Sequence, residues 1–102
     1  MGAQGTASLD FGAFPGSSDT SVVITGQAAI LSGSLAEAWI FPAVTADHTA
    51  DEHLVEELKV MAGNVVAGVG FTIYGLHEPS VNSVDGVGTR LYGIFNVGWV
   101  WN

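Results

Sequence analysis

The chain has 102 residues, the length of a single domain, and no stretch suggests a second core. Its net charge of −8, with Lys59 and Arg90 the only basic residues, excludes nucleic acid as a direct partner, because phosphate binding requires clustered Lys and Arg. Membrane is excluded as a partner too, since no window reaches the roughly 20 apolar residues of a spanning helix and an anionic surface would repel the chain.

The composition indicates a surplus of apolar surface. Hydrophobic residues make up 48% of the chain and charged residues only 12%, whereas a typical soluble domain carries about twice that charged fraction. So few charged side chains do not cover the surface of a small monomer. We therefore expect part of the apolar surface to be buried against another copy of the chain or against another protein.

The cysteine content and the N-terminal sequence bear on the cellular compartment in which we expect the protein to work. The absence of cysteine excludes disulfides and thiolate metal sites. The first ten residues lack the basic and apolar regions of a secretion signal. We expect the protein to stay in the cytoplasm of the cell that makes it, or to assemble there into a larger particle.

The N-terminal third begins with small residues and then turns to strand formers. Residues 1–8 are small and polar, and they predict a flexible arm that precedes a single β domain over residues 9–102. The dipeptide Pro15-Gly16 is a strong turn signal. The β-branched residues of Ser21–Thr25 then predict a strand that Gly26 ends.

The next strand is predicted over Leu35–Phe41, where side chains alternate, and Pro42 ends it. On one face we expect Leu35, Glu37, Trp39 and Phe41, and on the other Ala36, Ala38 and Ile40.

The segment from residue 45 to residue 62 admits two interpretations. A capping box at Thr49 and a repeating apolar face favour a short helix over Ala50–Ala62. Alternatively, Val55–Ala62 pairs with Val65–Tyr74 through the two-residue turn Gly63-Asn64, which is typical of a β-hairpin. The local pattern favours the helix and leaves the hairpin open.

The C-terminal part predicts a long loop and a final strand. Residues His77–Thr89 are rich in Pro, Ser, Asn, Asp and Gly, which is typical of an exposed loop. Leu91–Trp101 predicts a strand that is apolar on both faces, and such a strand is central in its sheet or covered by a neighbouring subunit. One face holds Leu91, Phe95, Val97, Trp99 and Trp101. We therefore predict an all-β fold, a β-sandwich or barrel-like domain of short antiparallel strands, with a short helix near residues 50–61 as the open alternative.

The polar segment around residue 50 is the strongest candidate for a site. Its weak candidate metal ligands are His48, Asp51, His53 and Glu57. Their spacing matches no established zinc motif, so we predict no metal. We expect the two histidines to form local hydrogen bonds or to meet at a subunit junction, where their titration would make assembly sensitive to pH.

No pattern in the chain indicates catalysis. There is no cysteine, no Gly-x-Ser-x-Gly elbow and no complete nucleotide-binding loop, and the carboxylates outside the polar segment are scattered. We expect no enzymatic activity, no catalytic residue and no cofactor.

Aromatic residues are the best candidates for an interface. We predict that Trp39, Phe95, Val97, Trp99 and Trp101 contribute to a core or to subunit contacts, and we assign them to the interface. A less favoured alternative is a sugar-stacking platform of the three tryptophans with Phe95 and Tyr92. We also expect Gly68, Gly70 and Gly98 to make room for aromatic rings.

Several segments together resemble the small virion structural proteins of tailed bacteriophages. The resemblance extends from Leu9 to Asn102 and is carried by Asp10–Gly16, Glu37–Ile40 with the His48 and His53 region, Ala62–Tyr74, and Tyr92-Gly93 with Trp99-Val100-Trp101. It implies a β-rich subunit and a strand rather than a helix over Val55–Ala62. It supplies no catalytic residues.

The resemblance also implies a role and partners. We expect a capsid decoration, or cement, protein that self-associates, with a trimer favoured, and that binds the major capsid protein or other virion proteins in the particle. A component of the tail, baseplate or head–tail connector is the alternative within this class. A receptor- or sugar-binding module is the alternative outside it.

Overall fold

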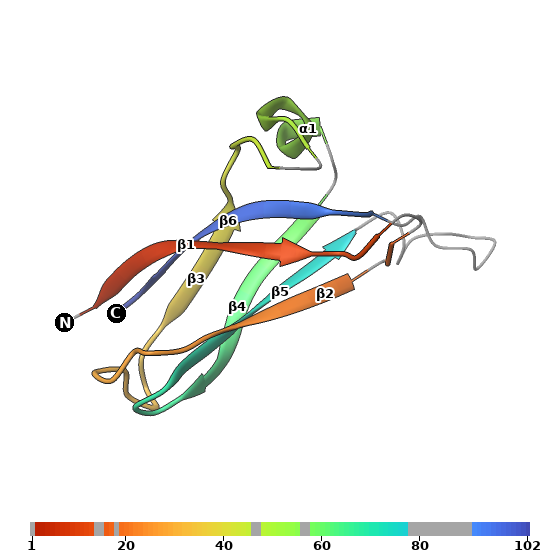
Figure 1. Cartoon of the computed structure of the whole chain (residues 1–102). Coiled ribbons are helices and arrows are strands. Elements are labelled where there is room, and N and C mark those ends of the chain that lie inside the picture. The colour runs from red at the N-terminus through yellow and green to blue at the C-terminus, as the bar shows by residue number, and fades with distance from the viewer. Residues whose placement is uncertain (1, 14–15, 18, 46–47, 56–57, 78–90) are drawn as a thin grey trace.

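The computed structural model describes residues 2–13, 16–17, 19–45, 48–55, 58–77 and 91–102. Two three-stranded antiparallel sheets pack against each other, which confirms the predicted all-β fold (Figure 1). One sheet has the order β1–β6–β3 and the other the order β2–β5–β4. The elements are β1 (Ala3–Asp10), β2 (Asp19–Ile24), β3 (Ala36–Ile40), α1 (Ala50–Val55), β4 (Leu58–Val66), β5 (Gly70–His77) and β6 (Ile94–Trp101).

The last strand, β6, is the central strand of its sheet, as its apolar sequence predicts. It pairs with β1 on one side and with β3 on the other. The five residues that the sequence places on one face of this segment are all buried. Leu91 precedes β6 and forms an isolated bridge with Ser17. Both termini lie side by side at one end of this sheet (Figure 1).

The core lies between the two sheets and is built from alternate residues of their strands. Phe71 packs edge to face against Trp99, with ring centroids 5.5 Å apart, and the indole Nε1 of Trp101 donates a hydrogen bond to Gln27 Oε1. Each large apolar side chain buried in this way contributes about 1.5–3 kcal/mol. The core residues are Leu9, Phe11, Ile30, Phe71, Ile73, Leu91, Phe95, Val97, Trp99 and Trp101.

The prediction of a flexible arm over residues 1–8 is wrong. Residues from Ala3 onward form β1, which pairs with β6 along its whole length. The small residues are required by packing rather than by flexibility. A Cβ added to Gly5 would lie 2.6 Å from Cζ2 of Trp99, so only glycine lets β1 lie against that ring.

The ambiguous segment contains both a helix and a strand. The helix α1 ends at Val55, and β4 begins at Leu58, so each interpretation was right for part of the segment. The predicted turn is in the wrong place, because Gly63 and Asn64 form an irregularity within β4, where Asn64 has a φ of 51°. The prediction of one strand over Val65–Tyr74 is also wrong, because β4 ends at Val66 and β5 begins at Gly70.

The true turn between β4 and β5 lies over Val66–Val69. The amide of Val69 donates to the carbonyl of Val66, and Gly68 adopts a φ of 75° that favours glycine. The amide of Gly68 also donates to the carbonyl of Ile30. This contact with a distant loop stabilises the turn. The sequence around the turn alone does not predict it.

The remaining predicted strands agree with the structure. The segments Ser21–Thr25 and Leu35–Phe41 correspond to β2 and β3 within one or two residues at each end. Of the predicted loop His77–Thr89, the first residue ends β5 and the rest lies outside the described residues. Within the described ranges, no helix has the length and apolar character needed to cross a membrane.

Candidate interaction surfaces

The two histidines of the polar segment are buried beside Phe95. His48 stacks on the Phe95 ring with centroids 4.1 Å apart, and His53 meets it edge to face at 5.1 Å. Because α1 and the residues before it connect β3 with β4, these contacts hold that connection against the start of β6 (Figure 1).

Hydrogen bonds fix both histidine rings. The backbone amide of Asn96 donates to Nε2 of His53, so Nδ1 of that ring carries the proton and donates to the carbonyl of Thr49. In His48, Nε2 donates to the carbonyl of Tyr92. These bonds confirm the expectation of local hydrogen bonding, and they occupy both ring nitrogens of His53 and Nε2 of His48.

The candidate metal ligands are not brought together. Asp51 is exposed, while His48 and His53 are buried against Phe95. Glu57 lies outside the described residues. No group of three or more histidine or carboxylate side chains with metal-binding geometry occurs in the part of the chain that the structure describes.

The predicted aromatic interface is largely the core of the chain itself. Phe95, Val97, Trp99 and Trp101 are buried between the two sheets, so their assignment to an intermolecular interface is wrong. Trp39 alone of the predicted set is exposed, at 45% of its surface. The same burial rules out the three-tryptophan sugar platform.

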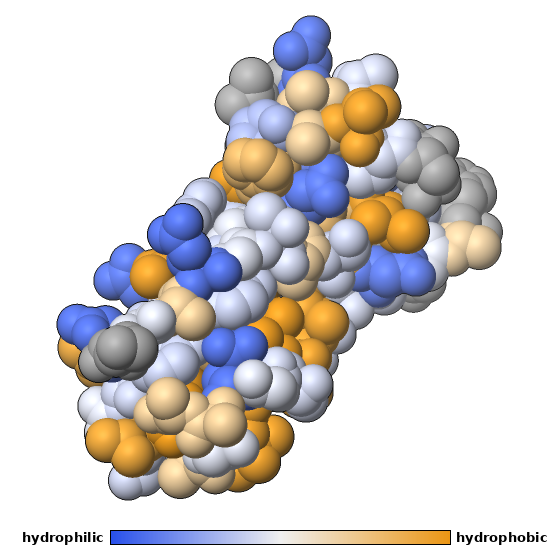
Figure 2. Space-filling model, turned by 60° about the vertical axis from the view of Figure 1, so that its left-hand side comes forward, coloured by the Kyte–Doolittle hydropathy of each residue, from blue (hydrophilic) through white to orange (hydrophobic). Residues whose placement is uncertain are grey.

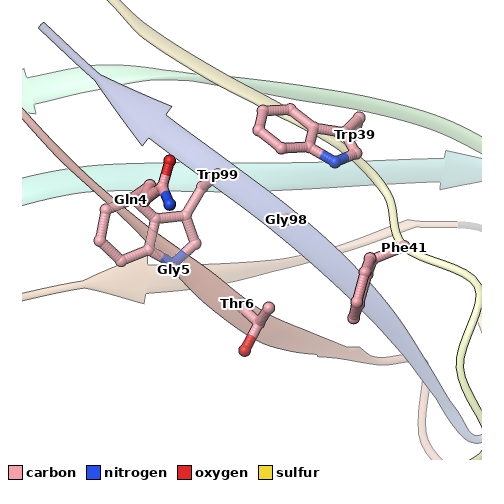
Figure 3. Close-up of a pocket in the computed structure, with 7 residues that line it drawn as sticks. All are labelled: Gln4, Gly5, Thr6, Trp39, Phe41, Gly98 and Trp99. Carbon is pink, nitrogen blue, oxygen red and sulfur yellow. The ribbon is translucent and has the colours of Figure 1, made fainter.

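Trp39 lies on the outer side of the β1–β6–β3 sheet, above Gly98 of β6 (Figure 3). A Cβ at Gly98 would lie 2.7 Å from Trp39 Nε1, so this glycine makes room for the indole as predicted, whereas Gly68 and Gly70 do not face a ring. Together with Phe41, Trp39 lines a hollow of about 280 Å³. Its other lining residues are Gln4, Gly5, Thr6, Gly98 and Trp99.

We call this outer side of β1–β6–β3 the aromatic face, defined by Leu35, Trp39 and Phe41. These three residues on and beside β3 are all exposed, Leu35 to 77%. The charged residues at the same outer positions of the sheet are Glu37, which lies between Leu35 and Trp39, and Asp10 of β1, and the described residues of these strands include no cation. The aromatic face therefore combines exposed apolar side chains with acidic ones.

A second apolar surface covers the outer side of the β2–β5–β4 sheet. Val23, Met61 and Tyr74 are exposed there, Val23 to 62%. Met61 and Tyr74 are cross-strand partners, and Tyr74 also pairs with Ser21. A hollow of about 270 Å³ lies beside them. We call this surface the mixed face, because it also carries Asp19 and Lys59.

Sequence reasoning missed the mixed face, although a signal was present. The strands β2, β4 and β5 each carry consecutive apolar residues, such as Val22-Val23, Val60-Met61 and Ile73-Tyr74. One member of each pair enters the core and the other points outward. Exposed hydrophobic side chains are accordingly interspersed with polar ones on the molecular surface (Figure 2).

Comparisons of the chain with protein-family models, with curated proteins and with solved structures find no match.

Proposed function

We propose that this protein is a non-enzymatic structural subunit of a bacteriophage virion, a capsid decoration protein that binds the shell through its aromatic face. The observation that carries the proposal is the exposure of Trp39 and Phe41 as neighbouring outward residues, with Leu35 beyond Glu37 on the same side, on a chain that already has a complete aromatic core. Exposed apolar patches of this kind on a small protein mark binding surfaces for other proteins.

The geometry of the aromatic face supports a binding role. Trp39 rests against the backbone of Gly98, which restricts the indole before any partner arrives. Aromatic side chains that are already ordered lose little conformational entropy on binding, and tryptophan is enriched among residues that dominate binding energy. A flat sheet face with such an anchor suits a broad protein surface.

The charges around this face favour a different protein over a second copy of the chain. Glu37 and Asp10 would meet like charges if two aromatic faces packed together. A shell protein with basic residues beside an apolar depression would complement both the apolar and the acidic side chains of this face. The net charge of −8 supports the same choice of partner.

The test is the protein content of purified phage particles whose genome encodes the chain. Quantitative mass spectrometry is expected to find the chain in many copies per shell, whereas a few copies per particle would assign it to the tail or connector. Absence of the chain from the particles would contradict the proposal.

A matched pair of variants connects particle binding to the aromatic face. Trp39→Ser is expected to lower the number of copies per particle more than tenfold, since truncating a central aromatic anchor costs about 2 kcal/mol or more. Val44→Ser is the control, because Val44 is 76% exposed and lies outside the defining residues of the face. Equal incorporation of both variants would argue against a role for Trp39.

A further inference from the structure

We propose that the mixed face binds the mixed face of a second copy of the chain around a two-fold axis. This inference does not rest on the virion role, because it concerns the other sheet and only the chain itself. Three kinds of observation support it: the apolar residues of the face, the placement of its charges, and the contrast with the aromatic face.

All three strands contribute to the apolar part of the mixed face. Val23 of β2, Tyr74 of β5 and Met61 of β4 are all exposed on the same side of the sheet. Leu76, half-buried, lies one outward position beyond Tyr74 on the central strand. Packing two such faces together would remove these side chains from water, which is the main driving force for association.

The charges on this face form a pattern that complements itself. Asp19 of β2 and Lys59 of β4 are both register partners of Leu76, so they lie on opposite sides of it in one row across the sheet. A two-fold axis that lies in the plane between two stacked faces and runs parallel to β5 near Leu76 exchanges the two ends of this row. Lys59 of one copy then lies opposite Asp19 of the other, and the contact occurs twice.

The rarity of basic residues in the chain makes the position of Lys59 informative about the partner. The chain contains two basic residues against ten acidic ones, and Lys59 is the basic residue within the described ranges. A purely acidic or purely basic partner would match only one end of the row. A second copy matches both ends, whereas on the aromatic face two copies would bring together acidic residues only.

The experiment measures dimer dissociation by sedimentation equilibrium for the full chain and for charge variants. Lys59→Glu places two acidic groups opposite each other, and Asp19→Lys places two basic groups opposite each other. Each substitution acts at both symmetric contacts, so each is expected to raise Kd about tenfold or more. Glu37→Lys, on the other sheet, is the control and is expected to leave Kd unchanged.

Mixing the two single variants tests the two-fold arrangement itself. In a mixed dimer, the glutamate introduced at position 59 meets the lysine introduced at position 19, and the native Asp19 and Lys59 form the other contact, so both contacts are attractive again. An equimolar mixture, and the double variant Asp19→Lys with Lys59→Glu, are therefore expected to recover dimers with a Kd within about threefold of the original. Met61→Asp is expected to abolish association in every combination, because it buries a charge in the apolar centre.

Three results would overturn the inference. They are a wild-type chain that stays monomeric, a trimer as the smallest assembly, or single variants that dissociate but do not recover on mixing. Circular dichroism of each variant confirms that it is folded, and the wild-type result is decisive even if a variant does not fold. Particle content, which tests the virion role, is a separate measurement and can fail independently.

Discussion

Gly5 and Gly98 lie on neighbouring strands of the same sheet, and each accommodates a tryptophan ring. Gly5 faces Trp99, which is only 7% exposed and packs against Phe71, so its ring has no room to move. Gly98 faces Trp39, which is nearly half exposed, so its ring has solvent on one side into which an added Cβ could displace it. The same small residue therefore has a structural role at one position and a role in presenting a surface at the other.

This difference predicts unequal effects of the same substitution. Gly5→Ala is expected to destabilise the fold by about 1–3 kcal/mol or more, since overpacking a rigid core forces strain on its neighbours. Gly98→Ala is expected to cost less than about 1 kcal/mol, because displacement of Trp39 relieves the clash and alanine restricts the unfolded chain. Urea unfolding followed by circular dichroism measures both values. Equal losses would be inconsistent with the assignment of Trp99 to the core and Trp39 to the surface.

Alternation in the sequence predicted which residues share a face, but it did not predict which face is buried. The set with Trp39 and Phe41 has the larger apolar side chains, yet it points outward together with Glu37, and Ala36, Ala38 and Ile40 point inward. These three inward side chains pack against the core, whose large side chains come from other strands. For β6 both faces are apolar, and burial of Trp99 and Trp101 follows from its central position.

Among the secondary-structure elements, β1 shows how composition can be misread. Its small residues are typical of a flexible arm, but they form an edge strand paired with β6 from Ala3 to Asp10. Their size is required by the tryptophan rings beneath them, which belong to a strand about ninety residues later in the sequence. No window of a few residues carries that information.

Deletion of residues 2–8 tests this assignment. Without β1, the backbone groups of β6 lose their partners on one side, and Trp99 and Trp101 become exposed. We expect the truncated chain to lose its cooperative unfolding transition and its near-ultraviolet circular dichroism. An added polar tag before residue 1 is the control and is expected to leave both unchanged. A truncated chain of unaltered stability would show that these residues are an arm after all.

The connection between β3 and β4 was predicted only in part. Capping and periodicity identified the helix α1, and apolar residues identified β4, but the boundary between them depends on distant contacts. His53 accepts a hydrogen bond from the amide of Asn96, 43 positions along the chain, and both histidines pack on Phe95. The histidines therefore form hydrogen bonds as expected, but their packing on Phe95 depends on a strand that the polar segment itself does not contain.

For the molecule as a whole, the low charge of the chain predicted an apolar surplus, and exposed hydrophobic residues on both outer faces agree with that expectation. The composition did not predict which apolar residues are exposed. In a sandwich of two three-stranded sheets, every strand has an outward side as well as a core side. The strand β6 supplies buried core residues, and the exposed large hydrophobic residues come from other strands and from the segments between strands.

This chain completes its own core and still leaves apolar sheet faces for other molecules, and we expect the first of these to be a second copy of itself. Sedimentation equilibrium of the wild-type chain over a wide range of concentration is the decisive experiment. We expect a mass of 10.5 kDa at high dilution that rises to twice this value as concentration increases. A mass that stays at the monomer value at every concentration would show that the exposed faces do not hold two copies together.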